Sequence, residues 1–234
     1  MKLKALSCGV LLGLLSTSAL ANDFSINVGA ISVMPDDSSS NLNVVETVAG
    51  LPENSTGVGV NTNTQLGLTF DYALTNNWTV ELVAATPFSH DITATGALAG
   101  LKVGKTKHLP PTLLAQYHFD LNNDMFKPFV GVGVNYTAFF DEQIDPQLRS
   151  TLGDLGVVTA DDSVSLALKN SWGYALQAGV NVELTKDWGL HFMVSRMDID
   201  TTGDVRVNDT TIQSVDVDIE TTKSGRQRIV GISH

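Results

Sequence analysis

Residues 171–184 alternate without a break between apolar side chains and small or polar ones. Trp172, Tyr174, Leu176, Ala178, Val180, Val182 and Leu184 form the apolar set. Successive side chains of a β-strand point to opposite faces, so this period of two predicts a strand with one apolar and one polar face. The run is long for a strand of a water-soluble protein, where about five or six residues is usual. It therefore favours a class of proteins with long strands.

The same alternation recurs along most of the chain. It covers residues 24–30, 65–74, 78–85, 112–119, 130–137 and 188–195, and Val215, Val217 and Ile219 begin one more strand. We therefore predict an all-β fold with eight antiparallel strands. After the first 21 residues, no segment has the roughly 18 consecutive apolar residues of a membrane-spanning helix, which excludes transmembrane helices.

The predicted connections alternate in length. Residues 75–77, 120–124 and 185–187 form short turns, and residues 35–63, 86–108, 140–166 and 200–214 form long polar loops. Short turns at one end and long loops at the other are typical of a bacterial outer-membrane β-barrel, which closes because lipid cannot satisfy a free sheet edge. Aromatic residues near strand ends would mark the lipid interface, namely Tyr72, Trp78, Tyr117, Trp172 and Trp188.

A soluble β-sandwich or a lipocalin-like carrier is the alternative fold. In those proteins the apolar face of each strand packs into a core, and the strands are usually shorter. The second face of these strands argues against that alternative, because it is rich in Gly, Asn, Gln and Thr and carries Glu81, Glu183 and His118. Such residues suit a hydrated or partly hydrated barrel lumen.

Residues 1–21 are predicted to be a secretory signal peptide. Lys2 and Lys4 precede a short apolar run, and Ala19-Leu20-Ala21 is a small-residue cleavage site. Cleavage would leave residues 22–234 as a single barrel domain of a bacterial envelope protein. It would remove the only cysteine, Cys8, and change the formal net charge from −11 to −13. A chain this acidic does not suit nucleic acid, and the cysteine count excludes a disulfide framework or a cysteine-based zinc site.

Several collinear segments resemble the OmpW family of small outer-membrane barrels. They are NTQLGLTF at 63–70, VELVAATPF at 80–88, HLPPT at 108–112, PFVGVGVNYT at 128–137, SWG at 171–173 and MDIDT at 197–201. The resemblance implies an eight-stranded barrel with a narrow hydrophobic lumen, which takes up small hydrophobic molecules passively and releases them sideways into the bilayer. It also implies outer-membrane lipids, lipopolysaccharide and the barrel-assembly machinery as partners. The alternative within the family is a bacteriocin or phage receptor, or an envelope-stress structural protein, with a closed lumen.

The C-terminal residues 219–234 depart from the family pattern. Family members end in an apolar strand with a terminal aromatic residue, which the assembly machinery reads. Here the tail contains no aromatic residue and carries Lys223, Arg226 and Arg228. A charge facing the middle of the bilayer costs about 2–4 kcal/mol. We therefore expect this tail to hinder normal closure and insertion of the barrel.

Neither an enzyme nor a cofactor or metal site is expected from the sequence. Ser89, His90 and Asp91 are adjacent, but neighbours on a strand point to opposite faces, which argues against a catalytic triad. His90 and His108 are instead expected in loops or at the barrel rim. Acidic pairs in the long loops could bind cations that bridge to lipopolysaccharide, but solvated surface groups are the simpler interpretation. These are Asp36-Asp37, Asp141-Glu142 with Asp145, and Asp161-Asp162.

Function is therefore expected in the lumen. The apolar residues in the inward phase are Val83, Leu114, Phe129, Phe139 and Met193, and they could line a path for hydrophobic solutes. A packed interior that only stabilises the barrel is the alternative. Proline cannot donate to a strand ladder, so Pro87, Pro110 and Pro111 could interrupt pairing and form a lateral opening.

Overall fold

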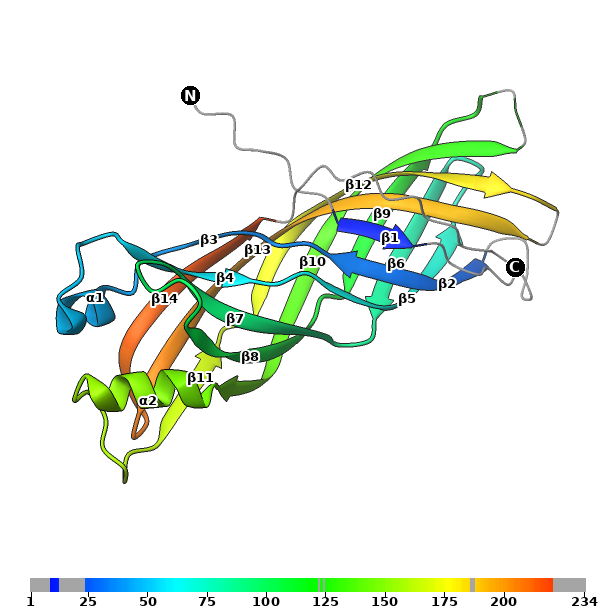
Figure 1. Ribbon diagram of the computed structural model, residues 1–234. Coiled ribbons are helices and arrows are strands. Elements are labelled where there is room, and N and C mark those ends of the chain that lie inside the picture. Colours follow the sequence, from blue (N-terminus) through cyan, green and yellow to red (C-terminus); the bar gives the residue numbers. More distant parts are fainter. Residues whose placement is uncertain (1–8, 13–23, 122, 124, 186–187, 221–234) are drawn as a thin grey trace.

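The alternating segments form long antiparallel strands that wrap around one axis, as the computed structural model shows (Figure 1). The structure describes residues 9–12, 24–121, 123, 125–185 and 188–220. Seven strands form the barrel wall in the order β2 (Phe24–Val33), β5 (Asn63–Ala73), β6 (Trp78–Ala85), β9 (Thr112–His118), β10 (Phe126–Ile144), β12 (Ser171–Glu183) and β13 (Gly189–Val207). Short connections join them at one end of the barrel. The predicted eight-stranded antiparallel barrel is confirmed.

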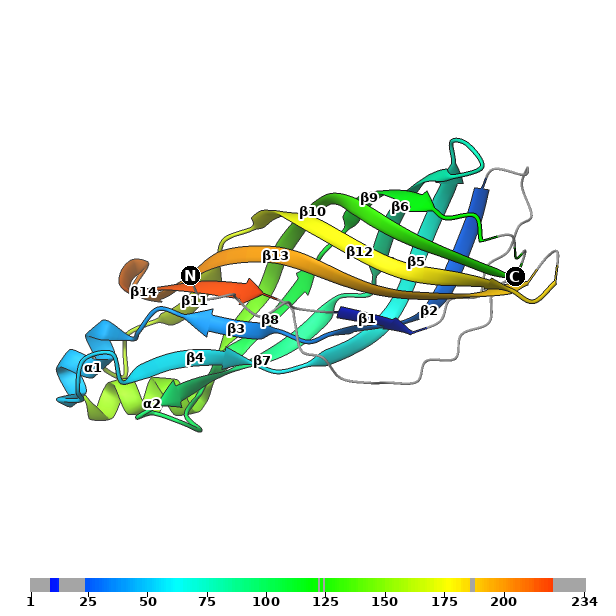
Figure 2. The same ribbon diagram turned by 90° about the horizontal axis from the view of Figure 1, so that it is seen from above.

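The eighth position of the wall is filled by two separate segments. β14 (Thr210–Glu220) pairs with Asp198–Val207 of β13, and is the strand predicted near Val215. Nearer the short turns, β1 (Gly9–Leu12) pairs with Ser195–Met193 of β13. β1 also pairs with β2, which closes the ring (Figure 2). β1 belongs to the segment predicted to be a signal peptide, whose cleavage stays a prediction. Most of the atypical tail, residues 221–234, lies outside the described residues.

The prediction of four long polar loops is wrong. Their residues continue the barrel as a folded extension opposite the short turns (Figures 1 and 2). The extension contains the ends of β10, β13 and β14 that lie farthest from the short turns. Its other elements are β3 (Asp36–Ser39), α1 (Asn43–Ala49), β4 (Thr56–Val60), β7 (Phe88–Gly96), β8 (Lys102–Leu109), α2 (Pro146–Asp154) and β11 (Val164–Leu168). These strands also alternate: Phe88, His90, Ile92 and Ala94 of β7 are buried. The polar residues between them face outward, and they gave the segment its loop-like composition.

The outer face of the barrel wall carries a band of exposed apolar side chains. Leu66 is 52% exposed, Val132 62% and Trp172 74%. Such a large apolar surface is expected where lipid replaces water. Trp78 and Tyr117 pack edge to face near the short turns, where Tyr72 is also exposed, and the Trp188 side chain lies half-buried at the same end.

At the other end of the band, Tyr136 packs on Trp172 with ring centroids 4.7 Å apart. Aromatic side chains therefore lie at both ends of the exposed band, as a pair of interface belts requires. Within the part of the chain that the structure describes, no helix has the length and apolar character needed to cross a membrane.

Candidate functional site

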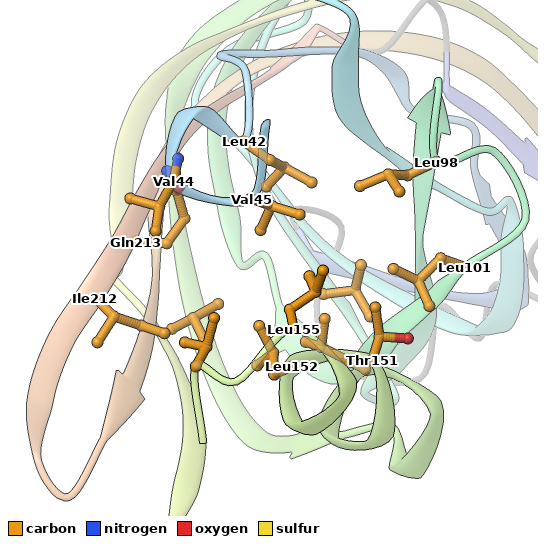
Figure 3. A pocket seen from close by; sticks show the side chains of 14 residues that line it. Leu42, Val44, Val45, Leu98, Leu101, Thr151, Leu152, Leu155, Ile212 and Gln213 are labelled. Atoms are coloured by element: carbon orange, nitrogen blue, oxygen red, sulfur yellow. Dashed lines mark hydrogen bonds between the residues drawn. The ribbon is translucent and has the colours of Figure 1, made fainter. Parts of the chain in front are cut away.

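Three apolar cavities lie one after another along the barrel axis. The outer cavity is enclosed by α1, α2, the β7–β8 turn and the β13–β14 hairpin (Figure 3). Leu42, Val45, Leu101 and Leu152 point toward its centre, and Thr151 and Gln213 are the polar residues that line it. The cavity therefore offers an apolar surface at the outermost end of the protein.

α1 is held over the outer cavity by one buried carboxylate. Glu46 accepts hydrogen bonds from the backbone N–H groups of Asn54, Ser55 and Thr56 at 3.0, 3.0 and 2.9 Å, and from Thr56 Oγ1 at 2.6 Å. These bonds, first among them the one from the Thr56 hydroxyl, lower the pKa of Glu46. The charged side chain thereby ties the helix to the start of β4.

The middle cavity contains two stacked imidazoles in otherwise apolar surroundings. Its lining includes Val58, Ile92, Phe139, His90 and His108. The His90 and His108 rings lie 4.8 Å apart at 11°, and the side chains are 1% and 5% exposed. The expectation that they lie in loops or at the rim is wrong, because β7 and β8 continue the alternating pattern and turn both residues inward.

These two histidines are neutral at ordinary pH. Burial lowers the pKa of His90, and burial together with the neighbouring His90 lowers the pKa of His108 to about 3. His90 Nδ1 lies 2.6 Å from the Asn61 carbonyl oxygen, so the neutral ring donates there. At the level of the two histidines, the outer face carries ion pairs of Lys105 with Asp91 and of Lys107 with Asp141. Charged pairs on the outer face place this part of the extension outside the hydrocarbon layer.

The inner cavity lies inside the barrel wall and contains two of the residues predicted to line the lumen. Val83 and Leu114 line it together with Phe88, Pro110 and Met197. Val33 lines both this cavity and the middle one. A single cluster of buried apolar residues connects all three levels, from Leu42 and Leu148 through Ile92 and Phe139 to Leu114.

The three cavities are small. The outer, middle and inner ones enclose about 30, 40 and 30 Å³. Each volume is far below the roughly 300–1,000 Å³ of a pocket that holds a drug-sized ligand. A solute would therefore have to displace side chains between the cavities as it moves.

Of the other three residues predicted to line the lumen, Phe139 lines the middle cavity, and the remaining two pack at the end of the apolar region nearest the short turns. Phe129 and Met193 are 1% and 2% exposed and share a cluster with Ile31, Val33 and Phe88. The Phe129 ring covers Gly179, where an added Cβ would come within 2.3 Å of its Cζ atom. The Phe129 ring also packs against the His191 and His118 rings, with centroid distances of 5.1 and 5.3 Å. The structure thus places all five predicted residues inside the barrel, and their role in passage stays a prediction.

Below the apolar region, polar side chains bond to one another across the lumen. Gln177 donates to Glu81 Oε1 at 2.6 Å and accepts from Gln116 at 2.7 Å. Asn27 donates to Asp71 at 2.7 Å. We call Asn27, Asp71, Glu81, Gln116, Gln177 and His191, all at most 8% exposed, the barrel polar cluster.

The barrel polar cluster corrects the expectation of a hydrated lumen. Its members are packed against one another, and Glu81 is fully buried. Glu183 is exposed at the short-turn end and pairs with Lys127 at 2.5 Å, so it is a rim residue. The cluster forms a polar floor beneath the apolar cavities.

The three prolines lie where pairing between neighbouring strands is interrupted. The β6–β9 ladder ends at Val83 opposite Thr112, and the β7–β8 ladder begins at Phe88 opposite His108. Pro87 lies in the gap on one side, and Pro110 and Pro111 lie on the other. Pro87 and Pro111 are exposed, whereas Pro110 is buried and lines the inner cavity. The interruption therefore lies beside that cavity.

Other polar groups weighed from the sequence have structural partners. His90 points inward while Asp91 is exposed and pairs with Lys105, so the adjacent Ser89, His90 and Asp91 do not converge. Asp145 caps α2 by accepting from Gln147 N at 2.9 Å, and Asp162 accepts from Thr159 N and Oγ1, both at 2.7 Å. These acidic residues stabilise the extension.

Comparison with known proteins identifies similar chains over almost the whole length. A family model described as the OmpW family matches residues 21–222. Outer membrane protein W of Vibrio cholerae is 39% identical over 224 residues, which covers 93% of this chain and 94% of that protein. Outer membrane protein W of Escherichia coli K12 is 40% identical over 198 residues, with coverage of 83% and 82%. The crystal structure of the outer membrane protein OprG from Pseudomonas aeruginosa superposes with a TM-score of 0.65 at 35% identity, covering 93% of this chain and 90% of that one.

Proposed function

The chain belongs to the OmpW family of bacterial outer-membrane β-barrels, and from this premise we propose that it provides a narrow path for passive uptake of small hydrophobic molecules. The observation that carries the proposal is the series of three apolar cavities from the outer end of the extension into the barrel wall. Apolar lining favours solutes that lose little hydration on entry.

Release sideways through the wall completes the proposed route. The barrel polar cluster lies beneath the inner cavity, and bringing an apolar solute through it would break buried hydrogen bonds. The gap beside Pro87, Pro110 and Pro111 borders the same cavity and faces the apolar outer surface. A solute leaving there would enter the hydrocarbon layer directly.

The proposal needs no covalent step and no cofactor. Its partners are the lipids around the exposed apolar band, lipopolysaccharide at the outer rim, and the assembly machinery that inserts the barrel. The relatives described above are likewise outer-membrane proteins. Solute would move down its own concentration gradient.

Flux through liposomes tests the lumenal route. Leu114→Gln and Val83→Gln place polar groups in the inner cavity, and each should reduce uptake of a small aromatic hydrocarbon at least several-fold. Leu114→Met keeps the cavity apolar and serves as the matched control, with near-unchanged flux expected. Both polar variants must first show the folded, heat-modifiable band on a gel. Unchanged flux in both would refute passage along this cavity.

A receptor role is the second candidate, and the outer end of the extension favours it. α1 exposes Val44 and Val48 there, at 37% and 45%. Exposed apolar side chains at the tip of a folded projection are suited to contact a phage or bacteriocin. Val48→Ser should strongly reduce sensitivity without changing solute flux if the tip is a receptor surface, because Val48 does not line the outer cavity. Unchanged sensitivity would exclude this role for Val48.

A further inference from the structure

Three side chains from three different strands each direct one unbonded atom toward a common point in the barrel polar cluster. The atoms are Asp71 Oδ1 on β5, Glu81 Oε2 on β6 and His191 Nε2 on β13, and with both carboxyl groups ionised none of them has a hydrogen-bond donor. Each of the three residues offers one ligand atom, and these ligand atoms lie within 4.8 Å of one another. We propose that they bind a divalent metal ion, with Zn²⁺ as the expected ion.

The opposite atom of each proposed ligand is already held by an amide side chain. Asn27 donates to Asp71 Oδ2 at 2.7 Å, and Gln177 donates to Glu81 Oε1 at 2.6 Å. The same arrangement occurs at the third ligand, His191.

His191 Nδ1 lies 2.6 Å from Asn181 Oδ1. A hydrogen bond from Nδ1–H to this oxygen leaves the lone pair of the neutral ring on Nε2. Metal-binding histidines and carboxylates are characteristically oriented by such outer partners. The three free atoms are thus held facing one another.

Charge and burial also favour an ion at this point. Glu81 is fully buried, His191 is 2% exposed and Asp71 8%. Buried carboxylates must be paired or coordinate a metal, because an isolated buried charge is costly. His191 Nε2 lies 3.6 Å from Glu81 Oε2, too far for a hydrogen bond. One divalent cation would balance two carboxylates and engage all three free atoms.

The ligand set identifies the kind of ion. One imidazole and two carboxylates suit zinc, whereas calcium prefers six to eight oxygens. Zinc bonds to nitrogen and oxygen ligands are about 2.0–2.2 Å long, which puts the ligand atoms of a tetrahedral site ~3.4 Å apart. Ligand atoms that lie as much as 4.8 Å apart would therefore move ~1.4 Å closer when the ion binds. Three protein ligands leave a fourth tetrahedral position for a water molecule. Such an ion would join β5, β6 and β13 across the lumen, independently of any solute in the apolar cavities.

Metal analysis of refolded protein tests the proposal. Untagged protein comprising residues 22–234 is refolded in detergent with ZnCl₂, freed of loose metal, and its folded fraction is analysed by mass spectrometry of the elements. One zinc per chain is expected. Asp71→Asn and His191→Asn should each lose it, and replacing zinc by Co²⁺ should give visible absorption bands of tetrahedral coordination in the wild type but not in these two variants.

His118→Asn is the matched control, because His118 also contacts the Phe129 ring but is not among the three ligands. It should retain zinc fully. Asn181→Ala removes only the support of His191 and should weaken zinc affinity about 10-fold or more. If His191→Asn fails to fold, Asp71→Asn and the Co²⁺ spectrum of the wild type still decide. Folded wild-type protein without zinc, or equal zinc in wild type and Asp71→Asn, would overturn the proposal.

Discussion

At the residue scale, the stacked pair His90 and His108 shows how the extension keeps its interior apolar. Each imidazole is polar in isolation, but both are buried beside Phe88 and Phe139. A lowered pKa keeps the rings uncharged, so the middle cavity carries no net charge. The same burial makes the folded protein sensitive to acid.

The stability of the extension should fall as the pH drops from about 6.5 toward 3. The unfolded histidine binds a proton near pH 6.5, whereas His108 in the folded chain resists protonation down to about pH 3. Between these values the unfolded state binds more protons, so acid favours unfolding. Denaturant unfolding at pH 7.5 and pH 4.5 should show a smaller pH-dependent loss in His108→Phe than in the wild type. Equal losses in the two proteins would contradict this assignment.

Glu46 should control local opening of α1. Glu46→Ala leaves three backbone N–H groups without their acceptor, so exchange of those amide hydrogens should speed up at least several-fold. Hydrogen exchange of Asn54, Ser55 and Thr56 measures it. The exposed neighbour Glu53 provides the control, since Glu53→Ala should leave those amides unchanged. Equal acceleration in both variants would mean that Glu46 is not the anchor.

At the scale of elements, the break between β6 and β7 and the break between β8 and β9 divide the wall into a membrane part and an extension. Both breaks contain proline, and pairing stops at Val83–Thr112 and resumes at Phe88–His108. Because lipid offers no hydrogen bonds, such a break within a wall facing lipid needs compensation. The Pro110 carbonyl oxygen accepts from Asn135 Nδ2 at 3.2 Å, which supplies part of it.

Bridging this gap should block release into the bilayer. With Ala84→Cys and Pro111→Cys, one position beyond the last β6–β9 pair, a short thiol-reactive cross-linker should reduce flux of a hydrophobic solute several-fold. Predicted signal cleavage removes Cys8, so these would be the only thiols. Leu82→Cys with Leu113→Cys, an outward pair inside the intact ladder, is the control and should conduct equally with and without cross-linker. Undiminished flux through the bridged gap would exclude it as the exit.

At the scale of the whole molecule, closure of the ring depends on the position between β13 and β2. In this chain β14 fills the part of this position in the extension, and β1 fills the part nearer the short turns. Signal cleavage would remove β1, leaving part of two strand edges facing lipid unless other residues pair there. An unpaired backbone group in lipid costs several kcal/mol. The residues that decide closure are therefore those that replace β1.

Replacing residues 221–234 by an alternating apolar strand that ends in Phe should raise the folded fraction of the protein beginning at Asn22. The natural tail places Lys223, Arg226 and Arg228 where a lipid-facing strand would run. Refolding in detergent followed by gel electrophoresis with and without heating measures the folded, heat-modifiable band. A control tail of the same composition in scrambled order should bring no gain. A wild-type protein that is already fully folded in outer membranes would refute this prediction.

The sequence by itself determined the strands of the wall and their two faces. Period two assigns each side chain to lipid or lumen, so the inward positions of Leu114 and Met193 and the exposure of Trp172 and Tyr72 could be predicted. It also predicted that Ser89 and Asp91 point away from His90. The pattern failed where outward polar residues resembled a loop, as in β7 and β8.

Only the tertiary structure decided which inward residues meet. Asp71, Glu81 and His191 come together because the closed ring brings β5, β6 and β13 around one narrow lumen. Alternation tells which face a residue occupies but not which residue lies opposite across the barrel, because that depends on the tilt and register of every strand between them. The stacking of His90 on His108 and the filling of the eighth position by β1 and β14 are decided in the same way. Closure is a property of the whole ring, and no single segment encodes it.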